Sequence, residues 1–357
     1  MKRILITNQF LRSYSGSELA TYDLAREFLA RGYTVTIGTF EYEAPLKGLF
    51  EVLGVDVIDL GTNAKAYEFD LIWAHHFTTL DACILSGLIS AGQIVFSSLS
   101  PYNPLECPPL YLSKLSRILA NSPETAQALL DAGLDASEVL VFPNPVYRTF
   151  FAQPARLSER LKRVAVVSNH VPKELEMAAS LLRAEGVEVD LFGEKHRARL
   201  ITPELLGDYD AVVSIGRTVQ YALAMGMPVY CYDRFGGPGY ITPQNADAAA
   251  AHNFSGRCVQ AKKPARRIAD ELLQQYGDVA AMQKLLKQLG TERYDLAVCV
   301  DEVLASLLTG CTPADTQTLI NLLRRQNAYR DDLYGQFRRS LCWKLTAPLR
   351  KLKKALA

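Results

Sequence analysis

The sequence from Gly216 to Tyr232 reads GRTVQYALAMGMPVYCY, and Gly236-Gly-Pro-Gly239 follows it closely. An apolar run, Ala211-Val-Val-Ser-Ile215, precedes it. This pattern predicts a buried strand, a helix that begins near Arg217, a second buried strand and a glycine-rich turn. Glycine at a strand end lets a ligand approach the backbone, and the free N–H groups of a helix N-terminus attract anions. We therefore expect the Arg217 guanidinium to bind phosphate there.

The rest of the chain repeats the same unit of apolar strand, polar or glycine-containing loop and amphipathic helix. The first unit has a strand at 3–7, a loop at 13–17 and a helix that ends near Gly32. A polar stretch with proline at 153–158 interrupts the alternation, which then restarts with a strand at 164–168. The pattern predicts an α/β fold with two parallel sheets in tandem, each covered by helices and facing a shared cleft.

From these breaks we expect an N-terminal domain at 1–150, a linker at 151–162, a C-terminal domain at 163–312 and a helical, basic tail at 313–357. The length of 357 residues favours two domains, because one hydrophobic core rarely extends over so long a chain. With 39 basic and 38 acidic residues, the chain lacks the basic excess of nucleic-acid-binding proteins. The 7 cysteines form no close CxxC pair, which is typical of a reducing cytoplasm and indicates no structural zinc.

Several common nucleotide-binding and hydrolase motifs are missing from the sequence. The loop after the first strand carries no GxGxxG fingerprint, and the chain has neither a P-loop nor a GxSxG elbow. Asp208-Tyr-Asp210 has the form of a metal-binding DxD pair, but it precedes its strand instead of following it. We therefore expect neither an NAD cofactor nor a metal ion.

Polar residues follow many of the expected strands, and this is where doubly wound sheets bind their ligands. These positions are Asn8, His75, His76, Ser97, Ser98, Asn121, Ser168, Asn169, Gly193, Ser214 and Asp233. Their number indicates a polar ligand that is rich in hydroxyl groups.

Over about residues 2–310 the chain resembles GT-B glycosyltransferases of family 4, which have two Rossmann-like domains. Ser15-Gly-Ser-Glu18 resembles that family's Gly-Gly-x-Glu loop, and Phe69-Asp-Leu-Ile-Trp-Ala-His-His76 resembles its strand that ends in histidine. Ala120-Asn-Ser122 and Phe142-Pro-Asn-Pro-Val146 are similar to the markers on either side of the last helix before the linker. Tyr221-Ala-Leu-Ala-Met-Gly-Met-Pro-Val229 is similar to the signature Glu-Ala-Met-Ala-x-Gly-x-Pro-Val.

The resemblance implies transfer of a sugar from a nucleotide-diphosphate donor, without a metal ion and with retention of configuration. It places the donor mainly on the second domain and the acceptor mainly on the first. The residues expected to bind the donor are Asn169, His170, Lys173, Gly193, Ser214, Gly216, Arg217, Tyr221, Gly236, Gly237 and Gly239. Ser15, Gly16 and Ser17 are expected to form the loop of the first domain at the cleft.

The sequence departs from the family pattern at the donor site. The family has glutamates where this chain has Tyr221 and Val213, and a Gly-Arg pair where it has Asn169 and His170. Tyr221 either offers its hydroxyl to the donor ribose or packs in the core. His75 and His76 are the candidate catalytic residues. Neighbouring strand residues point to opposite faces, so only one of the two can easily face the cleft, and His75 is the first choice.

The end of the chain carries a separate signal. Between Arg338 and Lys354 there are seven basic residues and no acidic one, interleaved with leucine and tryptophan. This composition favours docking to the anionic inner face of a membrane, through Arg338, Arg339, Trp343, Lys344, Arg350 and Lys351. The end of the chain also resembles an element of bacterial enzymes of cell-surface polysaccharide synthesis.

The sequence therefore predicts a cytoplasmic glycosyltransferase, peripheral to the membrane, that acts on a glycan or lipid-linked acceptor in bacterial surface polysaccharide or lipopolysaccharide assembly. Two alternatives stay open. One is a catalytically silent subunit of the same fold that docks a partner enzyme to the membrane, and the other is a nucleotide-sugar epimerase.

Overall fold

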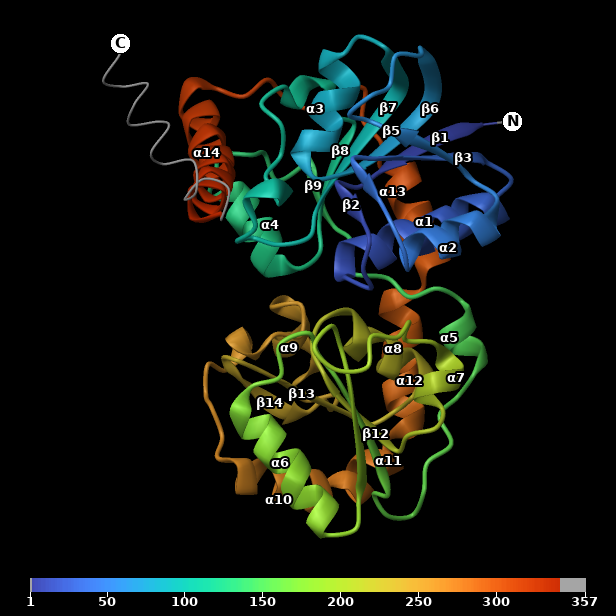
Figure 1. The fold of residues 1–357 in the computed structure, drawn as a ribbon, viewed down its shortest axis with the longest axis vertical. Helices are drawn as coiled ribbons and strands as arrows, with labels where there is room; N and C mark the ends of the chain where they lie inside the picture. The colour runs from blue at the N-terminus through green and yellow to red at the C-terminus, as the bar shows by residue number, and fades with distance from the viewer. Residues whose placement is uncertain (1, 341–357) are drawn as a thin grey trace.

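The computed structural model describes residues 2–340, which form two α/β domains connected by two crossings of the chain (Figure 1). The expected membrane-docking residues Trp343, Lys344, Arg350 and Lys351 lie outside the described residues. None of the helices between residues 2 and 340 has both the length and the apolar character needed to cross a bilayer.

The first domain is built on a seven-stranded parallel sheet with the order β5-β3-β1-β6-β7-β8-β9. Its strands are β1 (Arg3–Thr7), β3 (Thr34–Thr39), β5 (Asp56–Asp59), β6 (Tyr67–His75), β7 (Ile89–Ser98), β8 (Arg117–Ala120) and β9 (Val139–Val141). A short pair, β2 (Phe10–Leu11) and β4 (Glu41–Tyr42), lies beyond the sheet. The helices are α1 (Gly16–Ala30), α2 (Leu46–Leu53), α3 (Phe77–Leu85) and α4 (Pro123–Leu130), with the 3-10 turns η1 (Pro104–Glu106) and η2 (Leu112–Lys114).

The second domain has a five-stranded sheet with the order β11-β10-β12-β13-β14, in which only β14 is antiparallel to its neighbour. The strands are β10 (Arg163–Val167), β11 (Glu188–Phe192), β12 (Ala211–Ser214), β13 (Val229–Asp233) and β14 (Gly236–Tyr240). The longer helices are α6 (Lys173–Ala184), α8 (Arg217–Met225), α10 (Ala265–Gln274) and α12 (Gln283–Tyr294). The shorter ones are α5 (Thr149–Ala152), α7 (Pro203–Leu206), α9 (Ala246–Ala251), α11 (Tyr276–Ala281) and the turn η3 (Gly256–Cys258).

The strand, helix and strand expected from the opening stretch are β12, α8 and β13, so this prediction is confirmed. The expected glycine-rich turn at 236–239 is wrong, because these residues form the edge strand β14. A Cβ atom on Gly236 would lie 2.0 Å from the carbonyl oxygen of Ala261, and one on Gly237 would lie 2.0 Å from that of Cys231. These glycines therefore permit close backbone packing within the second domain.

The chain returns to the first domain after α12. The two crossing segments contact each other, since Val146 N–H donates to the Tyr294 carbonyl at 2.6 Å and Leu296 N–H donates to the Val146 carbonyl at 3.1 Å. Helix α13 (Leu296–Ala305) then packs beside α1, and α14 (Thr316–Arg339) packs on the first domain near α4 (Figure 1). Residues 296–312, expected in the second domain, thus contribute to the first, because the apolar face of α13 completes its core.

Candidate functional site

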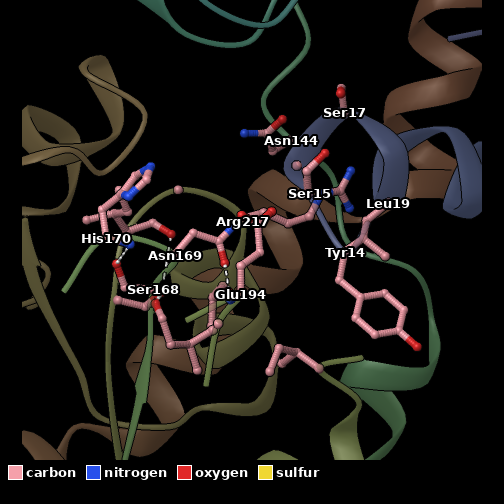
Figure 2. Close-up of a pocket in the computed structure, with 18 of the residues that line it drawn as sticks. Tyr14, Ser15, Ser17, Leu19, Asn144, Ser168, Asn169, His170, Glu194 and Arg217 are labelled. Atoms are coloured by element: carbon pink, nitrogen blue, oxygen red, sulfur yellow. Dashed lines mark hydrogen bonds between the residues drawn. The ribbon is translucent and has the colours of Figure 1, made fainter. Parts of the chain in front are cut away.

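A cleft of about 880 Å³ lies between the two domains. The first domain contributes the loop at 12–17, and the second contributes the loops that follow β10, β11, β12 and β13 at the carboxyl ends of their strands. Figure 2 shows Ser168, Asn169 and His170 along one side of this pocket and Tyr14, Ser15 and Ser17 along the other. The position matches the usual ligand site of doubly wound sheets.

The side chains that line the cleft carry an excess of positive charge. Its cations are Arg12, Arg199, Arg217, Arg234 and Arg257, and its acids are Glu106, Glu194 and Asp233. Three of the five arginines are ion-paired with carboxylates that do not line the cleft, so Arg199 and Arg234 are the guanidinium groups that favour an anionic ligand.

Helix α8 begins at this cleft. Gly216 precedes the helix with a φ of 53°, a conformation that L side chains rarely adopt, and the change of direction there brings Gly216, Arg217 and Thr218 to the cleft. Ser214, at the end of β12, donates its hydroxyl to the Val167 carbonyl at 2.7 Å and so connects the ends of two strands. The N-terminus of α8 therefore lies at the cleft, where the sequence predicts an anion site.

Arg217 lines the cleft as expected, but its guanidinium is paired across the domain interface. Its Nη1 donates to Asp23 Oδ2 of α1 at 2.8 Å and to the Pro145 carbonyl at 3.3 Å. Both side chains are 8% exposed, and burial raises the pKa of Asp23 against the lowering effect of Arg217 and Arg26. In this arrangement Arg217 holds the domains together, and a phosphate would have to compete with Asp23 for it.

Tyr221 packs at the same interface. Its ring stacks on Phe150 with centroids 4.0 Å apart, and its hydroxyl accepts a hydrogen bond from Arg217 at 3.2 Å and lies 3.4 Å from Asp23 Oδ2. Burial raises its pKa above the ordinary value of 10.0. Of the two interpretations of Tyr221, the structure therefore shows the one in which the side chain packs in the core. Its hydroxyl group belongs to the Asp23–Arg217 cluster.

The loops after β10 and β11 form one wall of the cleft and brace each other. A Cβ atom on Gly193 would lie 2.1 Å from the Ser168 carbonyl oxygen, so only glycine allows this approach. The Asn169 side chain accepts a hydrogen bond from the Glu194 backbone at 3.2 Å, and Ser168 accepts one from the backbone of the exposed His170 at 3.1 Å. These contacts hold the two loops together as one wall of the cleft.

Arg199 and Arg234 are cleft residues that the sequence analysis missed. Both are exposed, and neither has a carboxylate partner among residues 2–340, while Arg234 also lies over the Phe235 ring at 4.8 Å. The sequence could have indicated Arg234 as a cleft residue, because it directly follows β13 and residues at strand ends line the cleft. Arg199 lies in an irregular segment after β11, where no periodic pattern indicates an orientation.

The loop at 12–17 reaches the cleft because Glu18 folds it back onto α1. The buried Glu18 carboxylate accepts hydrogen bonds from the Ser13 backbone at 2.7 Å, the Ser13 hydroxyl at 2.8 Å and the Ser15 hydroxyl at 3.0 Å. Ser15, Gly16 and Ser17 all line the cleft, as the sequence predicts.

The histidine pair does not line the cleft. Both ring nitrogens of His75 are buried without a hydrogen-bond partner, and burial together with His76 and Arg217 lowers its pKa to about 3. His76 Nδ1 accepts from the Gln9 backbone at 3.2 Å, and its Nε2 lies 3.5 Å from Glu106 Oε1, a carboxylate that does line the cleft. In this arrangement neither ring reaches the cleft lining, and their catalytic role stays a prediction.

Other predicted site residues also lie away from the cleft lining. Lys173 is exposed in the first turn of α6, and Gly236, Gly237 and Gly239 belong to β14, where their missing side chains allow close packing. The expectation that these glycines cradle phosphates is wrong for that reason. Near the chain end, Arg338 and Arg339 are the last residues of α14, and the exposed Arg339 lies 3.9 Å from Asp332.

Two further polar contacts connect the domains at the edge of the cleft. The Arg257 guanidinium donates to both carboxylate oxygens of Glu124, with Nε–Oε1 at 3.0 Å and Nη2–Oε2 at 2.7 Å. Asn144 donates to the Asn253 side chain at 2.8 Å. Together with the Arg217–Asp23 pair, these contacts hold the two domains in their present orientation. A change in the relative orientation of the domains would break them.

No protein-family model and no curated protein matches the sequence. Solved structures do match. HepE from Anabaena in complex with UDP-glucose has a TM-score of 0.60 and 17% identity, covering 86% of this chain and 100% of that one. A glycosyltransferase from Rickettsia africae has a TM-score of 0.56 and 15% identity, covering 85% and 97%.

TarM from S. aureus, solved as a mutant with UDP, has a TM-score of 0.58 and 10% identity, covering 86% of this chain and 99% of that one. These similarities extend over both domains. The chain therefore has the GT-B fold, with two Rossmann-like domains that face each other across a cleft, and the predicted fold class is confirmed.

Proposed function

We propose that the chain is a glycosyltransferase that transfers a sugar from a nucleotide-diphosphate donor to a glycan or lipid-linked acceptor. The observation that supports this proposal most directly is the arginine-lined cleft at the strand ends, which includes the N-terminus of α8. The GT-B fold, which this chain shares with HepE in complex with UDP-glucose, supports the same assignment. Membership in family 4 is part of the proposal and rests on the motif resemblance.

In this proposal the diphosphate lies at the start of α8, where Arg199 and Arg234 are available to it. Negative charge grows on the diphosphate as it leaves, so fixed cations and helix N–H groups stabilise the transition state. Because these groups supply the positive charge, we propose that transfer needs no metal ion. Asn169, His170 and Ser214 line the second-domain wall, where they are placed to contact the donor's hydroxyl groups.

The buried histidines can take part in catalysis only if the protein changes conformation. His75 is neutral at physiological pH and both its nitrogens lack partners, so its hydrogen-bonding capacity is unused in this arrangement. We propose that the two domains shift when donor and acceptor bind, and that this shift exposes the end of β6 and the Arg217 guanidinium to the substrates. Retention of configuration is proposed from the family resemblance.

We further propose that the protein works at the cytoplasmic face of the membrane in bacterial surface polysaccharide or lipopolysaccharide assembly. The basic run between Arg338 and Lys354 supports this placement, since such segments bind anionic lipid. Deleting residues 341–357 is expected to lower sedimentation with anionic vesicles while leaving donor binding intact. Equal sedimentation of the two chains would remove the membrane part of the proposal.

The function itself is tested with a panel of uridine, guanosine and thymidine diphosphate sugars. Calorimetric titration is expected to give saturable binding of one donor class, and slow hydrolysis of that donor without acceptor would identify the sugar. Absence of binding across the panel would reject the transferase.

One observation favours a second candidate, a silent subunit of the same fold. Arg217 and Tyr221, both expected at the donor, are engaged with Asp23 and each other, and no glutamate stands at 213 or 221. A silent subunit would bind no donor, so the same titration separates the two candidates.

A further inference from the structure

The first domain places a buried carboxyl group, that of Glu106, at the cleft. Glu106 is the last residue of η1 and lines the cleft, although its side chain is largely buried. The other two acids of the described cleft lining belong to the second domain. Glu194 is exposed, and Asp233 accepts hydrogen bonds from the Ser255 hydroxyl and the backbone of its own domain. Glu106 is thus the acidic group on the side where the acceptor is expected.

The backbone around Glu106 is fixed by its neighbours. Its N–H group donates to the Asn103 carbonyl at 3.0 Å, and the Asn103 side chain accepts from the Leu105 N–H group at 3.1 Å. Helix α14 packs against η1, and the buried Gln326 side chain of that helix donates to the Pro108 carbonyl at 2.9 Å. A side chain that is held in this way offers a ligand a group of fixed position.

The partners of the Glu106 carboxylate are few. Its Oε2 accepts a hydrogen bond from the Leu99 backbone at 2.7 Å, and its Oε1 lies 3.5 Å from His76 Nε2. The other ring nitrogen of His76 accepts from the Gln9 backbone at 3.2 Å, so the hydrogen of the neutral ring lies on Nε2. Glu106 therefore faces an N–H donor at long range and not a full positive charge.

Glu106 has capacity left for a ligand. In the part of the chain from 2 to 340, neither an arginine nor a lysine forms an ion pair with it. Buried carboxylates are normally paired, and a carboxylate can accept about four hydrogen bonds, of which Glu106 makes one at short distance. His76 also has a φ of 68°, and such strained residues are frequent at functional sites. The arrangement fits a carboxylate that accepts a hydrogen bond from a molecule in the cleft.

The charges of the cleft restrict what that molecule can present to Glu106. A phosphate group would be repelled by the carboxylate. An ammonium group would be repelled by Arg199 and Arg234, which line the same cleft without carboxylate partners among the described residues. An uncharged hydroxyl group donates a hydrogen bond and meets neither repulsion.

We propose that Glu106 binds a hydroxyl group of an uncharged sugar unit of the acceptor. This inference rests on the proposed transferase function and narrows its acceptor class, because the part of the acceptor that enters the cleft is then a sugar and not the phosphate of a lipid head group. Glu106 on the first domain selects the acceptor, and the unpaired arginines on the second domain take the diphosphate.

The test uses the methyl glycosides of glucose, galactose, mannose and N-acetylglucosamine, titrated into the full chain in the presence of uridine, guanosine or thymidine diphosphate. Ligand-observed NMR is expected to show saturable binding of at least one glycoside. Glu106→Gln, which keeps the side-chain size but removes the charge, is expected to weaken that binding about tenfold. Glu106→Asp withdraws the carboxylate by one methylene group, so it is expected to weaken binding as well and keeps the proposal testable if Glu106→Gln fails to fold.

Glu68→Gln is the matched control, because Glu68 is an exposed carboxylate of the same domain at the amino end of β6, outside the cleft lining. Its affinity for the glycoside is expected to equal that of the unchanged chain. Calorimetry with the diphosphate alone separates the two proposals, since the affinity of the Glu106 variants for it is expected not to fall.

If the unchanged chain binds no diphosphate, the proposed function fails and this inference fails with it. If the diphosphate binds, three results would overturn the inference alone: no glycoside binds, Glu106→Gln binds it as well as the unchanged chain does, or Glu68→Gln loses as much as Glu106→Gln. Tighter binding of glycerol 3-phosphate than of any glycoside would also overturn it and indicate an acceptor that presents a phosphate.

Discussion

At the scale of single residues, the Arg217–Asp23 pair decides how the cleft works. Both side chains are 8% exposed, and the pair spans the domain interface at 2.8 Å. A buried pair of this kind contributes little net stability, but losing one partner leaves an uncompensated charge. While Arg217 is paired with Asp23 it holds the domains together, and its positive charge is then not available to an anion in the cleft.

Asp23→Asn is expected to strengthen binding of a nucleoside diphosphate by about 1 kcal/mol, because the asparagine no longer neutralises Arg217. Calorimetric titration of the two chains with the donor's diphosphate measures the difference. A weaker or equal affinity in Asp23→Asn would mean that Arg217 serves only to connect the domains.

His75 predicts a pH dependence of stability. Between its ordinary pKa of 6.5 and about 3, the unfolded chain binds a proton that the native His75 does not bind. Stability is therefore lost as the pH falls through this range, by up to about 1.4 kcal/mol per pH unit.

Thermal denaturation from pH 7 to pH 4 is expected to show a shallower loss in His75→Asn than in the unchanged chain. The exposed His196, changed to asparagine, provides the matched control and is expected to keep the original slope. Parallel curves for all three chains would show that His75 is accessible to protons in the native state.

At the scale of elements, the unit β12, α8 and β13 could be predicted from the sequence because its pattern is local. Apolar runs, an arginine after Gly216 and a glycine at the helix end define it without knowledge of distant residues. The glycines of β14 could not be assigned in the same way. They look like a turn, and only the approach of the Ala261 and Cys231 carbonyls explains why they form a strand.

Gly216 makes this element testable. With φ at 53° and ψ at −135° it lies in a region that L residues rarely adopt, so Gly216→Ala is expected to lower the free energy of unfolding by about 1–3 kcal/mol. Gly48→Ala is the matched control, because Gly48 lies inside α2 with open space around it and should gain about 1 kcal/mol. Denaturant titration measures both, and a neutral Gly216→Ala would contradict the strained conformation.

At the scale of the whole molecule, the sequence predicted two domains and a cleft, and the structure adds how they are held together. The pairs Arg217–Asp23 and Arg257–Glu124 join residues far apart in the chain, and no local pattern indicates such partners. The same limit applies to α13. Its amphipathic pattern predicts a helix but does not tell which of two cores will accept the apolar face.

The Arg257–Glu124 pair predicts a pH effect at the interface. Burial opposes ionisation of Glu124, but hydrogen bonds from Arg257 and Tyr102 outweigh it and lower the pKa below the ordinary value of 4.5. The pair thus stabilises the molecule above that value and stops doing so as the pH falls through the lowered pKa.

Glu124→Gln is accordingly expected to lower the free energy of unfolding by about 1–2 kcal/mol at pH 7, and by less as the pH falls below 4.5. Denaturant titration of both chains at pH 7 and below pH 4.5 measures this difference in the free energy of unfolding. A difference that stays the same at both would show that the pair acts by shape and not by charge.

In the proposed function, Arg199 and Arg234 of the cleft between the domains bind the diphosphate of a nucleotide sugar. The most direct measurement is a calorimetric titration of the donor's diphosphate into the unchanged chain, the double variant Arg199→Ala with Arg234→Ala, and the control Arg156→Ala with Arg160→Ala. The control removes two exposed arginines outside the cleft lining. The binding free energy is expected to fall by at least about 1.5 kcal/mol in the cleft variant and to stay unchanged in the control. Equal affinities in all three chains would contradict it.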